Sequence, residues 1–353
     1  MNTPAVRRRS PSVAAAGNDF FGEPFRPRRA FANGHAQTIA GNFLPRRSAL
    51  PPAEDRLFSV EPGVQVLCQC HWQAQRAAAM TVVIVHGLEG SSDSQYVIGT
   101  GSKAWLAGMN VVRVNMRNCG GTEHLGPTLY NSSMSADVGA IARTLIADDG
   151  LQKLAFVGYS MGGNLVLKLL GEWGAGAPWE VKAGVGVSPA VDLAPSADAL
   201  HNPTNRIYEW KFLRGLRRRI RRKAALYPER YDVRHLRGMR SLRDFDDQIT
   251  ARYSGFRDAD DYYTRAAAAR VVEHITVPTL ILHSLDDPFI RVLPQTRDKL
   301  LANPNITYVE TAYGGHCAFL ADANGYDGRW AERQAICFLQ RLNGGEPLKL
   351  AAP

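Results

Sequence analysis

Blocks of hydrophobic residues recur along the chain, and their patterns predict strands that alternate with helices. Short apolar runs rich in valine, isoleucine and leucine are typical of strands, and they occupy residues 81–85, 110–115, 154–157, 183–187, 278–282 and 306–310. Segments with apolar residues at helical spacing follow them, at residues 96–106, 137–148, 162–173, 293–301 and 330–342. This alternation predicts an α/β fold with a mostly parallel central sheet and helices on both faces.

An alternating pattern of period two precedes the first of these strands. Residues 55–72 alternate around a Pro62-Gly63 turn, which predicts a β-hairpin at the edge of the sheet. The same stretch carries Cys68, Cys70 and His71, which are residue types that bind zinc. Because no second pair of ligands follows at the spacing of a zinc site, we interpret the cysteines as buried thiols and predict no metal ion.

The strand pattern stops between residues 194 and 270, where an insertion between two strands would form a helical cap. Apolar residues recur there at helical spacing, at Leu213, Leu216, Ile220, Ala224 and Tyr227. Basic residues fill the other faces: Arg214, Arg217, Arg218, Arg219, Arg221, Arg222 and Lys223. The simplest interpretation is a cap helix with a solvated charged face. The alternative is peripheral contact with an anionic membrane, for which the sequence shows no second anchor.

Length, composition and charge limit the number of domains and the kinds of partner that the chain can have. With 353 residues, 45% of them hydrophobic, it can form one large core with an insertion. We therefore predict a disordered basic tail over residues 1–19 and one domain over residues 20–353. The net charge of +9 is concentrated, with +6 in residues 1–50 and +8 in residues 201–225, which leaves −5 elsewhere. Because no basic surface is spread over the fold, no nucleic-acid partner is expected.

The cysteines and the apolar runs bear on the cellular compartment. The five cysteines are odd in number and widely scattered, which is unlike a disulfide framework. No signal peptide precedes them, and no apolar run reaches the roughly 18 residues that a membrane-spanning helix needs. The sequence therefore predicts a cytoplasmic protein without a transmembrane helix.

A serine flanked by glycines follows the strand at residues 154–157, in the stretch Gly158-Tyr159-Ser160-Met161-Gly162. The pattern Gly-x-Ser-x-Gly at a strand-to-helix turn is the nucleophile elbow, in which a strained backbone holds the serine hydroxyl out above the sheet. The flanking positions must be small because the strand and the helix cross closely. Alone, the pattern is only moderately specific, since glycine-rich turns also occur for packing reasons.

Two later strand ends supply the partners that a nucleophilic serine needs. An imidazole must take the proton of the hydroxyl, and a carboxylate must orient the imidazole. His316 follows the last strand, and Asp286 and Asp287 follow the strand before it. The order Ser, Asp, His is that of α/β-hydrolases. If the loop follows the usual small-x-x-Asp pattern from Ser284, Asp287 is the acid, and Asp286 faces solvent or caps the loop.

Two backbone N–H groups are expected to bind the oxyanion that forms during acyl transfer. One belongs to Met161, directly after the serine, and the other to Leu88, in the loop after an earlier strand. His86 begins the same loop, and we expect it to brace the loop by hydrogen bonding. No cofactor is predicted.

Together these motifs resemble the YheT-like family of α/β-hydrolases. The resemblance covers residues 20–342 and is carried by Gly34-His35-Ala36-Gln37-Thr38, His86-Gly87-Leu88-Glu89-Gly90-Ser91, Asn115-Met116-Arg117-Asn118-Cys119-Gly120-Gly121, Gly158-Tyr159-Ser160-Met161-Gly162-Gly163-Asn164, Asp286-Asp287-Pro288-Phe289 and Gly314-Gly315-His316. It implies an esterase with Ser160, Asp287 and His316 as its triad, among relatives that hydrolyse or form medium-chain acyl esters or act on lipids. Asn118 stands where the family usually has glycine. Asparagine tolerates a left-handed backbone, so we expect the loop shape to survive.

The function predicted from the sequence is hydrolysis of carboxylic esters through an acyl-enzyme, with a small-molecule acyl ester or a lipid as substrate. The nearest alternative is an acyltransferase that passes the acyl group to an alcohol. A protein of a different class, which binds nucleic acid or another anionic surface on a hydrolase scaffold, would rest on Arg7 to Arg9 and Arg217 to Lys223. A complete Ser-Asp-His set argues against that alternative.

Overall fold

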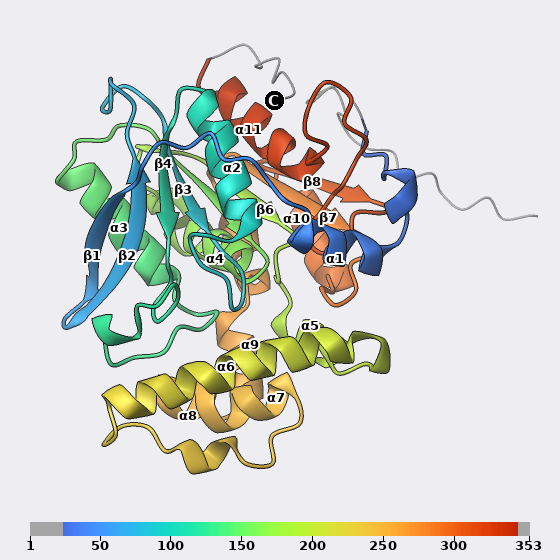
Figure 1. The fold of residues 1–353 in the computed structure, drawn as a ribbon. Coiled ribbons are helices and arrows are strands. Elements are labelled where there is room, and N and C mark those ends of the chain that lie inside the picture. The colour runs from blue at the N-terminus through green and yellow to red at the C-terminus, as the bar shows by residue number, and fades with distance from the viewer. Residues whose placement is uncertain (1–23, 345–353) are drawn as a thin grey trace, which may run out of the picture.

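An eight-stranded sheet forms the centre of the computed structural model, which describes residues 24–344 (Figure 1). The tail predicted over residues 1–19 lies outside the described residues. The strands lie in the order β1-β2-β4-β3-β5-β6-β7-β8. Their bounds are β1 Glu54–Glu61, β2 Val64–His71, β3 Thr81–Val85, β4 Asn110–Val114, β5 Leu154–Tyr159, β6 Val181–Val187, β7 Thr279–Ser284 and β8 Ile306–Thr311.

The pairing of the strands is antiparallel at one edge and parallel elsewhere. β1 and β2 form an antiparallel hairpin, and β2 is also antiparallel to β4. The remaining neighbours pair parallel. The predictions of an edge hairpin and a mostly parallel sheet are therefore confirmed. On β2, Cys68 and Cys70 are buried free thiols, as expected, and His71 lies on the opposite face of the strand, where it accepts a hydrogen bond from Arg113 Nε at 3.3 Å.

Helices cover both faces of the sheet (Figure 1), and the sheet separates two clusters of buried apolar side chains. α2 and α11 pack on one face, and α3, α4 and α10 pack on the other. On β3, Val82 and Ile84 belong to the cluster on the side of α2 and α11, whereas Val83 and Val85 belong to the cluster on the side of α3, α4 and α10. Both sets are apolar because both faces are covered, which explains the continuous β-branched run in the sequence. The helix bounds are α2 Gln95–Leu106, α3 Ser135–Ala147, α4 Met161–Trp173, α10 Pro294–Ala302 and α11 Trp330–Leu342.

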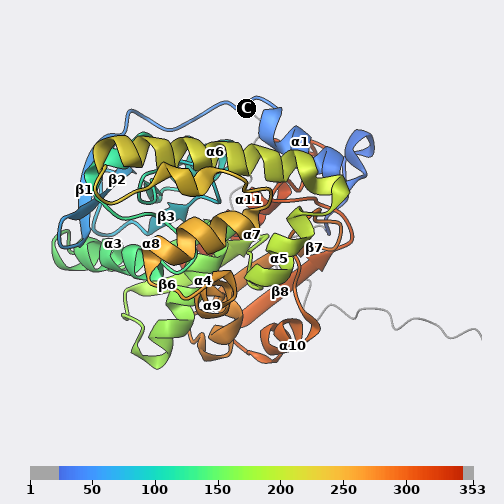
Figure 2. The same ribbon diagram turned by 90° about the horizontal axis from the view of Figure 1, so that it is seen from below.

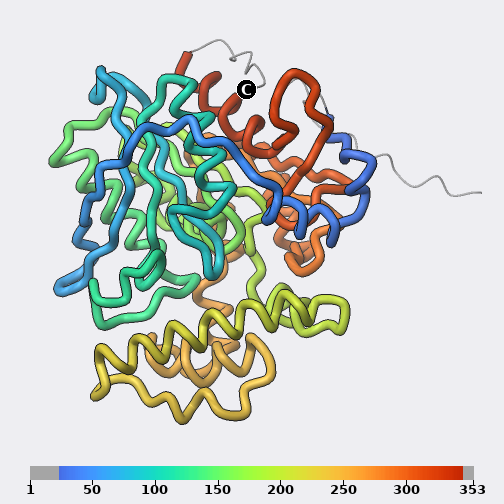
Figure 3. Tube along the Cα trace, in the orientation of Figure 1, coloured from blue at the N-terminus to red at the C-terminus, as the bar shows by residue number. Residues whose placement is uncertain are grey.

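The chain between β6 and β7 forms a helical cap beyond the end of the sheet, as predicted (Figures 1 and 3). In Figure 3 the trace passes from the sheet into this cap and back again. Across residues 24–344, no helix is both long and apolar enough to cross a bilayer. The elements of the cap are α5 Leu193–Leu200, α6 Arg206–Leu226, α7 Leu242–Phe245, a π-helical turn Asp246–Ala251, α8 Arg252–Ser254 and α9 Ala259–Ala266.

The long cap helix α6 buries Leu213, Leu216 and Ile220, as the apolar spacing predicts. The prediction that its basic residues fill the other faces is wrong for Lys223, which is fully buried. Lys223 lies three residues after Ile220 and therefore on the buried side of the helix. Its Nζ donates to the carbonyl oxygen of Glu123 at 3.0 Å and to that of Gly126. Burial lowers the pKa of Lys223 to about 8.

Candidate active site

Ser160 lies at the turn between β5 and α4, with φ of 53° and ψ of −117°. A positive φ is strained for a residue with a side chain, so the surrounding packing must hold it. The backbone N–H of Ser160 donates to the carbonyl oxygen of Val187 on the neighbouring strand at 2.9 Å. A Cβ atom on Gly158 would clash with the backbone of Gly162, and one on Gly162 would clash with the backbone of β3 and its loop. The close crossing thus requires glycine at both positions.

Asp287 and His316 meet at the carboxyl ends of β7 and β8. Asp287 Oδ2 accepts a hydrogen bond from His316 Nδ1 at 2.8 Å, and its other oxygen accepts from the backbone N–H groups of Phe289 at 3.1 Å and Ile290 at 2.9 Å. Burial raises the pKa of the Asp287 carboxyl, but the charge and hydrogen bond of His316 outweigh burial and lower it. Asp286 instead accepts from the backbone N–H of Gly315 at 2.8 Å. The structure therefore brings Asp287, and not Asp286, to the imidazole.

The second ring nitrogen of His316 has a different neighbour. Its Nε2 lies 3.6 Å from Cys317 Sγ, and no hydrogen bond joins it to Ser160 within residues 24–344. Such bonds are often long before substrate binds. Burial lowers the pKa of His316, but the adjacent Cys317 and the carboxylate of Asp287 raise it by more, so the net shift is upward.

Leu88 and Met161 line, together with Ser160, a pocket between the sheet and the cap. Leu88 follows β3, and Met161 is the first residue of α4. In the described part of the chain, neither backbone N–H donates to another group, so both are available to a ligand.

His86 braces the loop that carries Leu88. Its Nε2 accepts from the backbone N–H of Met116 at 3.2 Å, so Nδ1 carries the proton and donates to the carbonyl oxygen of Gly87 at 2.7 Å. Burial lowers the pKa of His86 to about 4 and keeps the ring neutral. The expectation that His86 holds the loop agrees with this geometry.

Helix α1 (Gly34–Phe43) supports the loop of His316, a role that the sequence did not reveal. The hydroxyl of Thr38 accepts from the backbone N–H of His316 at 2.8 Å. The buried amide of Gln37 exchanges two hydrogen bonds with the backbone of Leu320, at 2.7 and 3.1 Å. A Cβ atom on Gly34 would clash with the backbone of Asp286. The Gly34 to Thr38 motif thus packs against the loops that carry Asp287 and His316.

A cluster of charges ties the cap to the loop of Leu88. Glu89 follows Leu88, and its carboxylate accepts from Arg219 Nε of α6 at 3.0 Å and from the hydroxyl of Tyr130 at 2.8 Å. The guanidinium of Arg219 also lies 4.9 Å from the centre of the Tyr130 ring. Its side chain is only 11% exposed, so the prediction that the basic residues of this helix lie on solvated faces is wrong here as well.

Arg219 also donates to the carbonyl oxygen of Asn118, in the loop after β4. Asn118 has a φ of 64°, so the expected left-handed backbone is confirmed. The side chain of Asn118 donates to the carbonyl oxygen of Thr128 at 2.9 Å. One arginine of the cap therefore contacts two loops at the end of the sheet.

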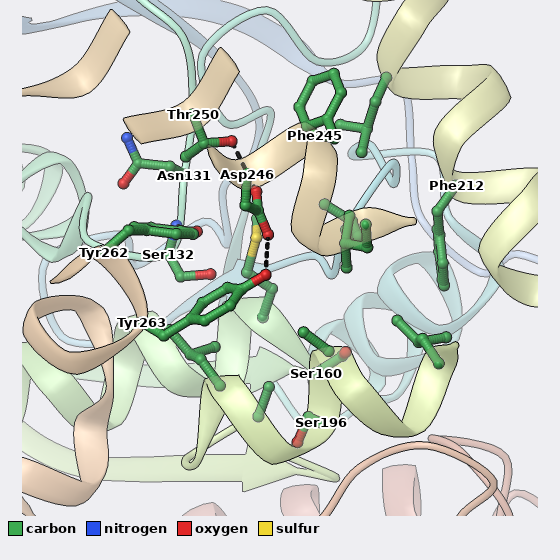
Figure 4. Close-up of a pocket in the computed structure, with 18 of the residues that line it drawn as sticks. Asn131, Ser132, Ser160, Ser196, Phe212, Phe245, Asp246, Thr250, Tyr262 and Tyr263 are labelled. Atoms are coloured by element: carbon green, nitrogen blue, oxygen red, sulfur yellow. Dashed lines mark hydrogen bonds between the residues drawn. The ribbon is translucent and has the colours of Figure 1, made fainter. Parts of the chain in front are cut away.

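The pocket above Ser160 lies between the sheet and the cap (Figure 4). Most of its wall is apolar and comes from Leu88, Met161, Ala190, Leu193, Ala197, Leu200, Phe212, Leu216, Leu242, Phe245, Phe289 and Ile290. One side is polar. There, the carboxylate of Asp246 accepts from the hydroxyls of Thr250 at 2.7 Å and Tyr263 at 2.8 Å.

Asp246 is buried and forms no ion pair within residues 24–344. Burial raises its pKa to about 6, although the two hydroxyl hydrogen bonds oppose the shift. No sequence motif marks this residue. In the described part of the chain, no group of three or more His, Cys, Asp or Glu side chains is arranged to hold a metal ion.

The fold and this site define a class of protein, and comparisons with known proteins agree. Residues 81–323 match the family model described as alpha/beta hydrolase fold. The chain belongs to the α/β-hydrolase family, and within it to the YheT-like members that its motifs resemble.

Among individual proteins, the chain is 33% identical over 312 residues to "Putative esterase YheT" of Escherichia coli (strain K12), across 87% of this chain and 90% of that protein. It is 29% identical over 241 residues to "Phospholipase ABHD3" of Bos taurus, across 68% of this chain but only 58% of that protein. The structure of the Pyrococcus furiosus esterase Pf2001 superposes with a TM-score of 0.54 at 15% identity, across 85% of this chain and 99% of the esterase, and this likeness supports the fold alone.

Proposed function

We propose that this protein is a serine hydrolase that cleaves carboxylic esters through an acyl-enzyme. The observation that carries the proposal is the 2.8 Å hydrogen bond between Asp287 and His316, at strand ends beside the strained turn of Ser160. An imidazole held by a buried carboxylate at such a turn is suited to activate a serine hydroxyl.

In the first half of the reaction, Ser160 Oγ attacks the ester carbonyl and passes its proton to His316 Nε2. Asp287 stabilises the resulting imidazolium, and the N–H groups of Leu88 and Met161 bind the negative oxygen of the tetrahedral intermediate. His316 then gives the proton to the leaving alcohol, and the acyl group remains on Ser160. In the second half, His316 takes a proton from water, the hydroxide attacks the acyl carbon, and the acid leaves as Ser160 recovers its proton.

The apolar wall of the pocket supports an acyl chain as the group next to Ser160. Binding such a chain there removes apolar surface of both the chain and the wall from water, which is favourable. The names of the relatives, an esterase and a phospholipase, support the same class of substrate. We therefore propose medium-chain acyl esters or lipid esters as substrates.

Labelling with a fluorophosphonate probe tests the nucleophile. Wild-type protein should be labelled, and Ser160→Ala should lose the label and at least about 1,000-fold in kcat while keeping its thermal unfolding temperature. A series of p-nitrophenyl esters of increasing chain length, with Ser160→Ala as control, would define the acyl pocket. A folded wild-type protein that reacts with neither the probe nor any ester would contradict the proposal. Adding an alcohol to the same assay separates hydrolysis from acyl transfer.

A further inference from the structure

The outward side of α6 carries a continuous stripe of cations. With about 3.6 residues per turn, positions 207, 210, 211, 214, 218, 221 and 222 share one side of the helix, opposite Leu213, Leu216 and Ile220. The stripe contains five cations and no acid: Lys211, Arg214, Arg218, Arg221 and Arg222. Of these, Arg222 alone forms an ion pair with an acid in residues 24–344, and that acid is Glu123. The other charges face solvent without compensation.

Large apolar side chains are exposed on the same side. Ile207 and Trp210 of α6 are 65% and 60% exposed, and Phe43 and Ile39 of α1 are 76% and 45% exposed. Burying such side chains against another apolar phase would remove a large unfavourable contact with water. The outward side of α6 therefore combines exposed apolar side chains near its N-terminal end with cations further along the helix.

Two contacts join α1 to the N-terminal half of α6. Lys211 Nζ lies 6.0 Å from the centre of the Phe43 ring. The rings of His35 and Tyr208 stack with centres 5.7 Å apart, and His35 Nδ1 lies 3.1 Å from the Tyr208 hydroxyl. Figure 2 shows α1 beside that end of α6, on the side of the molecule where the cap lies. We call this combined face the α1–α6 surface: Ile39, Phe43, Ile207, Trp210, Lys211, Arg214, Arg218, Arg221 and Arg222.

We infer that the α1–α6 surface binds an anionic lipid bilayer. Helices with a basic polar face and exposed Trp, Phe or Ile lie in the membrane interface, where the apolar groups enter the acyl boundary and the cations meet the headgroups. Stable attachment usually needs a second element, and α1 supplies it through Phe43 and Ile39. A nucleic acid would engage the cations, but the aliphatic side chains of Ile39 and Ile207 offer nothing to a phosphate backbone.

The same helix also forms a wall of the pocket. Phe212 and Leu216 of α6 line the cavity above Ser160, while Trp210 and Arg214 are exposed. A bilayer on the outer side of α6 would therefore lie about one helix diameter, roughly 10 Å, from the pocket. Delivery of a lipid ester over this short path rests on the proposed function, whereas binding to the bilayer does not.

Flotation with vesicles tests the inference directly. Full-length protein should bind vesicles of phosphatidylcholine mixed with phosphatidylglycerol, bind phosphatidylcholine alone much more weakly, and dissociate as salt is raised. The triple variant Arg214→Gln, Arg218→Gln, Arg221→Gln should bind the mixed vesicles about 100-fold more weakly. The double variant Phe43→Ala, Trp210→Ala should bind about tenfold more weakly or worse. Both variants should keep wild-type activity on a short soluble ester, because none of these side chains lines the pocket.

A matched variant controls for net charge. Arg234→Gln, Arg257→Gln, Arg265→Gln removes three exposed cations outside the α1–α6 surface and should bind as the wild type does. Ser160→Ala should also bind like the wild type, which separates this inference from the proposed catalysis. Equal binding to neutral and anionic vesicles, or equal losses in the two triple variants, would overturn the inference. Full binding by the Phe43→Ala, Trp210→Ala variant, together with salt-sensitive binding to duplex DNA, would overturn it in favour of a nucleic-acid surface.

Discussion

Two buried aspartates, Asp287 at the end of the sheet and Asp246 in the cap, have pKa values that are shifted in opposite directions. Asp287 accepts from the His316 ring and from two backbone N–H groups, and its pKa is lowered although burial opposes this. Asp246 accepts only from the two neutral hydroxyls of Thr250 and Tyr263, and burial raises its pKa to about 6. A carboxylate is stabilised by donors that carry charge or are held in place by the backbone, and neither kind donates to Asp246 in the cap. The charge of Arg243 in α7 lowers the pKa of Asp246 by less than burial raises it.

The opposite pKa shifts show that the two regions treat a buried carboxylate differently. The end of the sheet stabilises a charged carboxylate, because the loops after β7 and β8 place Asp287 and the His316 imidazole side by side. The cap encloses an apolar pocket in which the Asp246 carboxyl changes charge near pH 6. This comparison can be tested by changing each carboxyl in turn.

The largest effect is expected from the aspartate at the sheet. Asp287→Asn should reduce kcat by about 10,000-fold, because an amide cannot hold the imidazole in the tautomer that accepts a proton from Ser160. Asp286→Asn is the matched control, and it should cost less than tenfold, since Asp286 contacts the backbone of Gly315 and not the imidazole. Ester hydrolysis at saturating substrate measures both. A larger loss in Asp286→Asn would make that residue the acid.

The aspartate in the cap should affect stability and its dependence on pH. The folded-state pKa of about 6 lies above the usual 3.8, so the folded state keeps a proton that the unfolded state has lost. Stability therefore falls as pH rises from 4 to 6 and levels off above 6. The decrease should be about 3 kcal/mol for this group, and Asp246→Asn should lack it.

Urea unfolding at pH 4, 5, 6 and 7 would measure that difference, with the exposed Asp322→Asn as control for net charge. Parallel pH curves for wild type and Asp246→Asn would show that the cap holds the charge of Asp246 as easily as water does.

A smaller effect is expected where the two regions meet. Arg219→Met removes the cation that holds Glu89, so the N–H of the adjacent Leu88 should be less well placed for the oxyanion. Loss of one oxyanion donor costs about 100-fold or more, and loosening it should cost about tenfold in kcat with little change in KM. Arg218→Met on the exposed side of α6 is the matched control. A change confined to KM would assign Arg219 to substrate binding instead.

The smallest effect concerns the support of His316. Thr38→Val removes the acceptor of the His316 backbone N–H and should reduce kcat about fivefold, which corresponds to one neutral hydrogen bond. Thr38→Ser keeps the hydroxyl and should retain nearly full activity. If both variants lose activity equally, the methyl group and not the hydrogen bond supports the loop.

Much of the fold and the core of the candidate site follow from local patterns in the sequence. Buried parallel strands need apolar residues on both faces, so β3 to β7 appear as apolar runs. Loops at the carboxyl ends of these strands and of β8 must lie on one edge of the sheet. That is why Ser160, Asp287 and His316 could be picked out in order, and why Gly158 and Gly162 could be connected with a close crossing. The helical spacing of the apolar residues in α6 likewise predicted which side of that helix is buried.

Only the tertiary structure decided what the remaining polar residues do. Asp246, Arg219 and Thr38 act on partners that the chain brings together across long separations, or in a cavity that exists only when the cap lies on the sheet. The contact between α6 and Phe43 could not be predicted for the same reason, since Phe43 belongs to α1, far away in the sequence. The periodicity of apolar residues predicts which residues are buried. The partner of a charged group or a hydroxyl depends on which elements pack against that group in the folded chain. The sequence therefore determined the catalytic candidates, and the packing of the cap and α1 determined their surroundings.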